Sequence, residues 1–225
     1  PYTWGTVGII YNTKYVDEAD IGGWDLLWNE KYADRIVMID NSRDAFAIAE
    51  AMLGYSLNTE DPDELQAAAE LLAEQTAVVQ SYSMDDMYNV MENEEAWIAP
   101  YYAGDAMLMM DENPDLAFYL PEDQTFNVFI DAMCIPSCAE HKEEAELFIN
   151  FLTSPEISGG NMDYIGYGTP VSAAKEYMDP EMANNPVAYP DAATLDRGEA
   201  FVALSDEAQQ LMDNLFNEVK AGLAA

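Results

Sequence analysis

The hydrophobic positions of the chain follow two alternating periodicities. Short apolar runs predict strands, at residues 6–11, 35–40, 78–81, 96–100, 116–120 and 128–135. Amphipathic spacing predicts helices between and after them, at residues 43–53, 62–75, 84–93, 106–112, 140–152 and 206–221, with a shorter one from residue 155. Gly54 is placed to end the first of these helices in the left-handed conformation. Strands that alternate with helices over this length predict an α/β fold with a largely parallel sheet.

The composition adds a strong acidic bias to this pattern. Lys and Arg supply 8 residues and Asp and Glu supply 43, which gives a formal net charge of −35. Binding to nucleic acid requires a basic patch, so that partner class is excluded, and an anionic membrane surface is disfavoured for the same reason. Such a charge attracts a cationic small molecule, although a solvated acidic surface is the simpler interpretation. Half of the residues are hydrophobic and 12% are aromatic, which argues against disorder.

The ends and the cysteines of the chain add three expectations. The chain opens at Pro1 on an apolar, strand-like stretch without an initiating Met, so we expect it to start inside a longer protein. The chain contains no run of about 18 apolar residues, so no membrane span is predicted. Cys134, Cys138 and His141 could be zinc ligands, but a structural zinc site needs four, so we expect ordinary thiols and no metal.

Carboxylates and aromatic residues occur together at three predicted strands, either just after the strand or within it. Ligands of open α/β sheets bind at the carboxyl ends of the strands, so these positions are candidates for a site. Such a pairing suits an organic ammonium ion, because the carboxylate supplies charge and the ring supplies cation–π attraction. The alternative for each pair is a helix cap beside a core aromatic. The candidates are Asn41 and Asp44, Tyr102 and Asp105, and Phe129 and Asp131.

Catalytic machinery is poorly supported, and we expect no enzymatic activity. His141 is the sole histidine, so any triad would depend on that one residue. The 43 acidic residues supply many accidental carboxylate pairs, so an acidic hydrolase stays as an alternative. No glycine-rich phosphate loop is present.

Several motifs in order along the chain resemble one family, the solute-binding proteins of spermidine/putrescine ABC transporters. The resemblance covers essentially all 225 residues. The motifs are Pro-Tyr-Thr-Trp-Gly at residues 1–5, Trp-Asp-Leu-Leu-Trp at 24–28, Leu-Gly-Tyr-Ser at 53–56, Tyr-Ala-Gly-Asp-Ala at 102–106, Phe-Ile-Asp at 129–131, Ile-Gly-Tyr-Gly-Thr-Pro at 165–170 and Tyr-Pro-Asp-Ala at 189–192.

This resemblance implies a two-lobed receptor that binds its ligand between the lobes. The chain is similar to the second lobe, a periplasmic-binding-protein type II-like lobe with a central mixed, mostly parallel sheet flanked by helices. Residues 5–128 would form that lobe, residues 129–173 would cross to a first lobe that precedes this chain, and residues 174–225 would return to pack on the second lobe.

The resemblance also implies ligand-binding roles for individual residues. Tyr102 and Asp105, together with Phe129 and Asp131, fall on the family's aromatic and amine-binding positions. Asn41 and Asp44 fall on its acidic helix start, and Ser83 and Tyr167 on further pocket positions. Because Asn41 is an amide where spermidine-type members carry an acid, the pattern is more similar to that of putrescine-preferring members.

The implied function is capture of a polyamine, putrescine or spermidine, and its delivery to an ABC permease. The implied location is extracytoplasmic, either periplasmic or at the cell surface as a lipoprotein, and no cofactor is implied. A ferric-ion receptor is an alternative, because Tyr101 and Tyr102 are adjacent and phenolate oxygens suit iron. Phe148 and Phe151 should bury against the first lobe, so this chain by itself is expected to self-associate, to repack that segment, or to bind ligand weakly.

Overall fold

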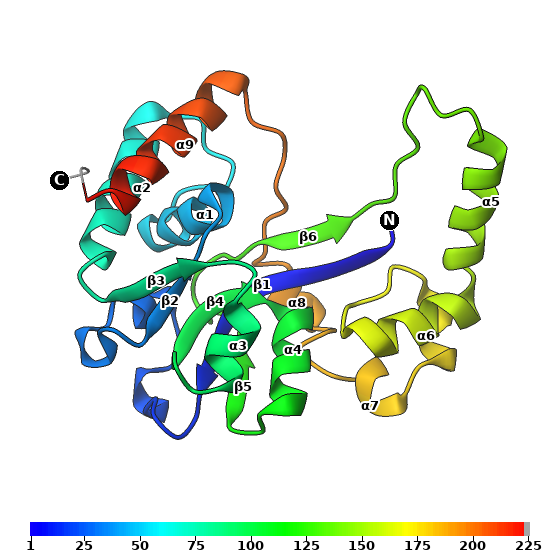
Figure 1. The fold of residues 1–225 in the computed structure, drawn as a ribbon, viewed down its shortest axis with the longest axis horizontal. Helices are drawn as coiled ribbons and strands as arrows, with labels where there is room; N and C mark the ends of the chain where they lie inside the picture. The colour runs from blue at the N-terminus through cyan, green and yellow to red at the C-terminus, as the bar shows by residue number, and fades with distance from the viewer. Residues whose placement is uncertain (223–225) are drawn as a thin grey trace.

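The computed structural model describes residues 1–222, in which a six-stranded sheet is flanked by helices (Figure 1). The strand order is β3-β2-β4-β1-β5, and β6 pairs with the other part of β1. The strands are β1 (Thr3–Asn12), β2 (Ile36–Ile39), β3 (Val79–Ser83), β4 (Ile98–Tyr102), β5 (Leu116–Tyr119) and β6 (Val128–Asp131).

The helices agree closely with the predicted pattern. They are α1 (Ser42–Leu53), α2 (Pro62–Gln75), α3 (Met87–Glu92), α4 (Ala103–Glu112), α5 (Lys142–Leu152), α6 (Pro155–Ile165), α7 (Pro180–Ala183), α8 (Ala192–Leu195) and α9 (Asp206–Lys220), with short 3-10 turns at Glu18–Asp20, Trp24–Trp28, Glu30–Tyr32 and Ser172–Tyr177. Gly54 ends α1 with a φ of 75°, as predicted. Among residues 1–222, no helix combines the length and the apolar character that a membrane span requires.

The direction of the strands confirms the α/β class and refines it. β2 runs parallel to β3 and β4, whereas β1 is antiparallel to β4, β5 and β6. Five strands therefore share one direction and β1 alone opposes them. Because β1 is ten residues long and pairs with three strands, three of the five pairings are antiparallel, and the sheet is mixed, as the resemblance implied.

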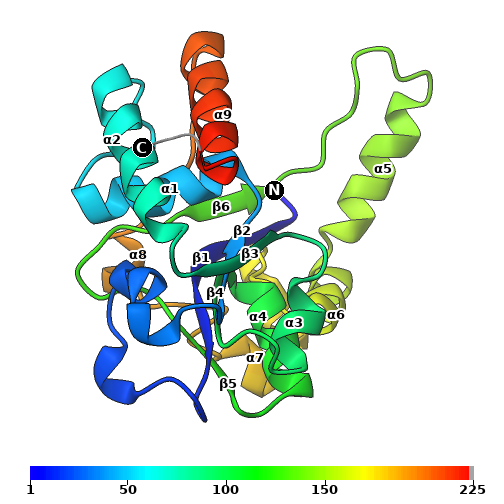
Figure 2. The same cartoon turned by 60° about the vertical axis from the view of Figure 1, so that its left-hand side comes forward.

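The main hydrophobic core lies between the sheet and its helices. Ile36–Ile39 of β2 is fully buried, which matches its continuous apolar run. Trp24 and Leu27 of the 3-10 turn pack into the same core. On one side α1, α2 and α9 pack against one another, and α2 and α9 stand side by side in Figure 2. The site residues described below are thus carried by a well-packed body.

A second part of the molecule extends beyond β6. β6 ends at Asp131, short of the predicted residue 135, and the chain then leads to α5, which stands away from the sheet (Figure 1). No residue of α5 is buried, and Phe148 and Phe151 are 59% and 53% exposed. The apolar face of this helix was predicted to bury against a first lobe outside this chain, and nothing among residues 1–222 packs over it, so that burial stays a prediction.

A smaller apolar cluster joins α6 to the segment that follows it. It contains Met162, Met178, Met182, Ala183 and Ala188. These residues come from both sides of residue 173, where one domain boundary was expected. The division into residues 5–128, 129–173 and 174–225 stays a prediction.

Candidate functional site

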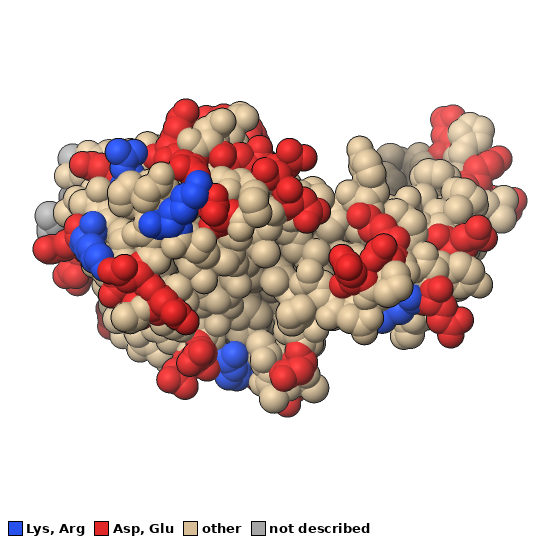
Figure 3. Space-filling model, turned by 90° about the horizontal axis from the view of Figure 1, so that it is seen from below, with Lys and Arg blue, Asp and Glu red and all other residues tan. Residues whose placement is uncertain are grey.

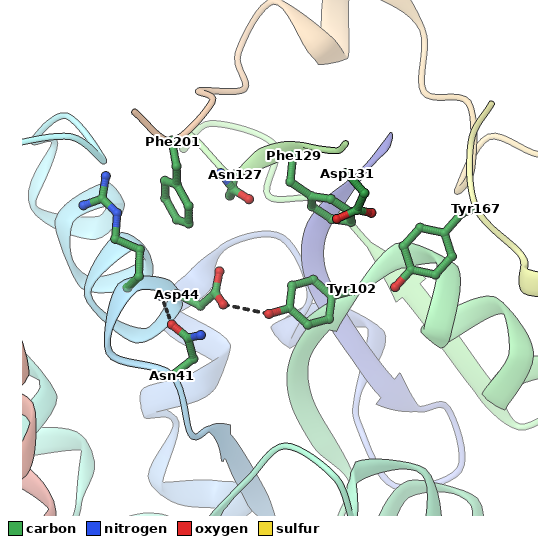
Figure 4. A pocket seen from close by; sticks show the side chains of 9 residues that line it. Asn41, Asp44, Tyr102, Asn127, Phe129, Asp131, Tyr167 and Phe201 are labelled. Atoms are coloured by element: carbon green, nitrogen blue, oxygen red, sulfur yellow. Dashed lines mark hydrogen bonds between the residues drawn. The ribbon is translucent and has the colours of Figure 1, made fainter. Parts of the chain in front are cut away.

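A pocket of about 330 Å³ opens at the edge of the sheet where α1, β4 and β6 come together (Figure 4). Six of the eight sequence-predicted site residues line it, which places residues from distant parts of the chain in one cavity. Its lining residues are Asn41, Arg43, Asp44, Tyr102, Asn127, Phe129, Asp131, Tyr167 and Phe201.

One end of the pocket is formed by the start of α1. The Asn41 side chain caps the helix, because its Oδ1 accepts a hydrogen bond from the Asp44 N–H at 3.2 Å. Asp44 is 6% exposed, and burial raises the pKa of its carboxyl. The Tyr102 hydroxyl donates to that carboxylate at 2.8 Å and opposes the rise in pKa. The helix N-terminus also favours a negative charge at this position.

Three aromatic rings continue from this end along the pocket. The rings of Tyr102 and Phe129 meet edge to face at a centroid distance of 5.5 Å, and those of Phe129 and Tyr167 at 6.0 Å. Gly5 on β1 makes room for the middle ring, since a Cβ there would lie 2.7 Å from the Phe129 ring. Gly104 does the same for Tyr167, with a Cβ distance of 2.1 Å. Ring faces of this kind can pack on the methylenes of a chain-like ligand.

The other end of the pocket carries Asp131, the last residue of β6. β6 pairs with β1 so that Asp131 stands opposite Thr3, whose hydroxyl donates to the Asp131 carboxylate. Asp131 is exposed, unlike Asp44. The pocket therefore holds two carboxylates, Asp44 and Asp131, with the rings of Tyr102 and Phe129 between them and the Tyr167 ring beside Asp131 (Figure 4).

Two predicted residues do not line this pocket. Asp105 lies behind Tyr167, and its two carboxylate oxygens accept hydrogen bonds from Tyr88 at 2.7 Å and Tyr167 at 2.9 Å. Ser83 ends β3, and its carbonyl accepts a hydrogen bond from the Asp40 N–H at 3.0 Å. Direct contact of Asp105 or Ser83 with a ligand stays a prediction.

Sequence reasoning missed three lining residues, Arg43, Asn127 and Phe201. Arg43 precedes Asp44 at the helix start and Asn127 precedes β6, so strand-end reasoning extended by one residue would have included both. Phe201 lies in a segment without periodic pattern, and only the tertiary fold brings it to the pocket. The Arg43 guanidinium stacks on the Phe201 ring at 4.4 Å.

The tyrosine pair does not offer the two phenolate oxygens that a ferric site would use. The Tyr101 hydroxyl donates to the Met84 carbonyl at 2.9 Å, whereas that of Tyr102 donates to Asp44. Tyr101 is buried and does not line the pocket. Cys134 and Cys138 are exposed free thiols, and residues 1–222 hold no cluster of three or more His, Cys, Asp or Glu side chains suited to a metal.

Acidic side chains are spread over the surface and not confined to the pocket. On the face shown in Figure 3, they lie on the body and on the part that carries α5, with few basic side chains among them. The net charge of −35 is therefore largely a property of the surface.

Comparisons with known proteins identify the relatives of this chain. The family described as bacterial extracellular solute-binding protein matches residues 1–197. The chain is 32% identical to the spermidine/putrescine-binding periplasmic protein of Salmonella typhimurium over 99% of its own length and 63% of that protein's. It is 27% identical to the putrescine-binding periplasmic protein SpuD of Pseudomonas aeruginosa, over 99% of this chain and 65% of that one. The chain thus spans about two thirds or less of these curated relatives.

Solved structures show the same relationship. A putative spermidine/putrescine ABC transporter protein from Listeria monocytogenes superposes with a TM-score of 0.91 at 33% identity, over 98% of this chain and 68% of that one. A spermidine/putrescine substrate-binding protein from Streptococcus pneumoniae gives a TM-score of 0.87 at 32% identity, over 99% and 68%. The predicted resemblance and extracytoplasmic location are confirmed, and the ferric-ion alternative is not favoured. The chain belongs to the bacterial extracellular solute-binding protein family.

Proposed function

We propose that this chain is the polyamine-binding lobe of a solute-binding protein that delivers putrescine or spermidine to an ABC permease. The names of the similar proteins support the ligand class and the transport role. The observation that carries the proposal is that the Asp44 and Asp131 carboxylates line one pocket together with a row of three aromatic rings.

Each part of a diamine has a counterpart in this row. One ammonium group binds Asp131 and the other binds Asp44, while the methylenes between them pack on the rings of Tyr102, Phe129 and Tyr167. An ion pair at about 4 Å contributes roughly 1 kcal/mol in water and about 4 kcal/mol at an effective dielectric constant of 20. Aromatic faces add about 0.5–2 kcal/mol for each cation. The binding strength therefore depends on how far the pocket is closed from water.

The start of α1 favours putrescine over spermidine. It supplies one carboxylate, Asp44, because the neighbouring pocket position is the amide Asn41, whose oxygen is already used in capping the helix. A third ammonium or secondary amine would have no second carboxylate at this end. We propose the shorter diamine as the preferred ligand.

The rest of the natural protein supplies the opposite wall of the pocket and covers α5 in this proposal. Leu147, Phe148 and Phe151 are exposed, and an apolar stripe of this kind requires a partner. The 225-residue chain by itself self-associates through this helix. Sedimentation analysis of the chain checks this, with Phe148→Ser/Phe151→Ser as the variant that should restore a monomer; a monomeric parent chain contradicts it.

Calorimetric titration of the full-length protein tests the function. Putrescine should bind more tightly than spermidine, and ferric ion should give no saturable binding. Mass spectrometry should recover the amine unchanged after incubation, since the role is binding and not turnover. Absence of binding by both amines would overturn the proposal.

A further inference from the structure

The segment at residues 198–204 crosses the edge of the pocket and is fixed there by its backbone. The Glu199 N–H donates to the Phe126 carbonyl at 2.9 Å, and the Val128 N–H donates to the Glu199 carbonyl at 3.0 Å. Gly198 allows this approach, because a Cβ there would lie 2.2 Å from the Val128 side chain. Phe201, two residues after Glu199, is thereby brought to the pocket wall.

The Glu199 side chain reaches the loop that follows α1. Its carboxylate accepts hydrogen bonds from the Ser56 hydroxyl, from the Leu57 N–H at 3.0 Å and from the Asn58 side-chain amide at 2.7 Å. The Asn58 side-chain oxygen in turn accepts from Arg43 Nη2 at 2.7 Å. Glu199 therefore connects β6, which carries Phe129 and Asp131, with the helix that carries Arg43 and Asp44.

Arg43 is an unexpected lining residue for a pocket that would hold cations. Its guanidinium stacks on Phe201, and its Nη1 is buried without a hydrogen-bond partner among residues 1–222. An uncompensated positive charge about 8 Å from a ligand ammonium weakens binding by tenfold or more at an effective dielectric constant of about 20. The second ammonium of a diamine, placed beside Asp44, would experience this repulsion most strongly.

Four carboxyl groups face Arg43, and they differ in how well they can offset its charge. Burial raises the pKa of Asp44, and it raises the pKa of Glu50 to about 8, so Glu50 is mostly protonated at neutral pH. Glu60 is exposed, and solvent screens it.

Glu199 differs from the other three carboxyl groups. Burial by itself would raise its pKa, but the hydrogen bonds from Ser56, Leu57 and Asn58 together lower it. Glu199 stays ionised at neutral pH, and it is already linked to the guanidinium through Asn58.

We infer that Glu199 is a positioning and specificity-determining residue, which holds Arg43 on Phe201 and offsets its charge so that the pocket accepts the second ammonium group of a dication. The inference rests on the proposed polyamine function for its ligand. Glu199 would thereby make the pocket selective for ligands with two charges, although its own side chain does not line the pocket.

Titration of full-length Glu199→Gln with putrescine and with n-butylamine tests the inference, because the two amines share a four-carbon chain and differ by one ammonium. The Kd for putrescine should rise about tenfold, and that for butylamine less than about threefold. Adding Arg43→Met to Glu199→Gln should restore most of the putrescine affinity, since the unbalanced charge is then removed. Ser56→Ala, which removes one hydrogen bond to the carboxylate and keeps its charge, should leave the ratio of the two Kd values unchanged.

Equal weakening for both amines, or no recovery on adding Arg43→Met, overturns the inference. A double-mutant cycle on unfolding of the ligand-free protein separates it from the proposed function. Coupling between Glu199 and Arg43 that weakens with salt supports the positioning role, and its absence overturns that role. Wild-type protein that shows this coupling but binds neither amine overturns the proposed function alone.

Discussion

Asp44 and Asp131 stand at opposite ends of one pocket, and their surroundings differ in nearly every respect. Asp44 is buried at a helix start, holds a hydrogen bond from Tyr102 and has a raised pKa. Asp131 ends a strand, is exposed, and has Thr3 as its side-chain partner. The buried end is organised before any ligand arrives. In the proposed function, the open end binds strongly only when a ligand and the rest of the full-length protein exclude water from it.

Removal of the carboxylate at the open end should have the largest effect on binding. Asp131→Ala should weaken putrescine binding to the full-length protein by about 3–5 kcal/mol, because it leaves an ammonium without its partner in a closed cleft. Calorimetry measures this loss. Thr3→Val is the matched control, since it removes the hydroxyl next to Asp131 and keeps the size; it should cost about 1 kcal/mol. An unchanged affinity in Asp131→Ala removes this residue from the site.

The buried end should instead control the pH dependence of folding. Glu50 lies two turns after Arg43 in α1, is fully buried, and neither of its carboxyl oxygens has a hydrogen-bond partner within residues 1–222. Burial raises its pKa from 4.5 to about 8, against the opposing effect of Arg43. The native state thus keeps a proton that the unfolded chain releases, and this contribution to stability is lost as pH rises from about 4.5 to about 8.

Glu50→Gln should remove this contribution. The free energy of unfolding of the parent chain should fall relative to the variant by up to about 1.4 kcal/mol per pH unit, or about 3–4 kcal/mol between pH 5 and pH 8. Urea unfolding at several pH values measures both slopes. The absolute stability of Glu50→Gln is less informative, because the new amide is also buried. Parallel slopes in the two proteins contradict the assignment.

The same contrast explains what the sequence could predict. Asn41, Asp44, Tyr102, Phe129 and Asp131 were found because each lies near the end of a strand or within it, where local pattern gives both the element and its position in the sheet. The class of fold followed from the same alternation. These residues depend on short-range periodicity, which is readable along the chain.

Features that depend on long-range packing were not readable. Phe201 reaches the pocket because Glu199 binds both Val128 and Asn58, and no local pattern encodes that contact. The opposing direction of β1 follows from its three strand pairings. The apolar stripe of α5 was correctly located by its amphipathic spacing, which states which face needs a partner, whereas the partner itself was named only through the family resemblance.

A smaller effect on binding is expected at Asp44. Asp44→Asn should cost about 1–2 kcal/mol for putrescine, less than the change at Asp131, because burial already disfavours the charge that is lost. Since burial raises the pKa of Asp44, parent affinity should fall as the pH decreases through that raised pKa, and the variant should show a flatter pH profile. Titrations with n-butylamine provide the comparison, because its single ammonium should occupy Asp131. If Asp44→Asn weakens putrescine binding as much as Asp131→Ala does, the expected difference between Asp44 and Asp131 is contradicted.

The smallest effect on ligand binding is expected at Asp105, which does not line the pocket. Both of its oxygens accept hydrogen bonds from tyrosines, so we expect it to act on binding by fixing the Tyr167 ring. Asp105→Asn and Tyr167→Phe should each weaken putrescine binding by about 0.5–1 kcal/mol, and the double variant should lose little more than either single variant, since both remove the same hydrogen bond. A direct ammonium contact instead requires the charge, and Asp105→Asn would then cost more than about 2 kcal/mol while Tyr167→Phe would not. Calorimetry on the four proteins of this cycle therefore decides whether the site has two carboxylates in contact with the ligand or three.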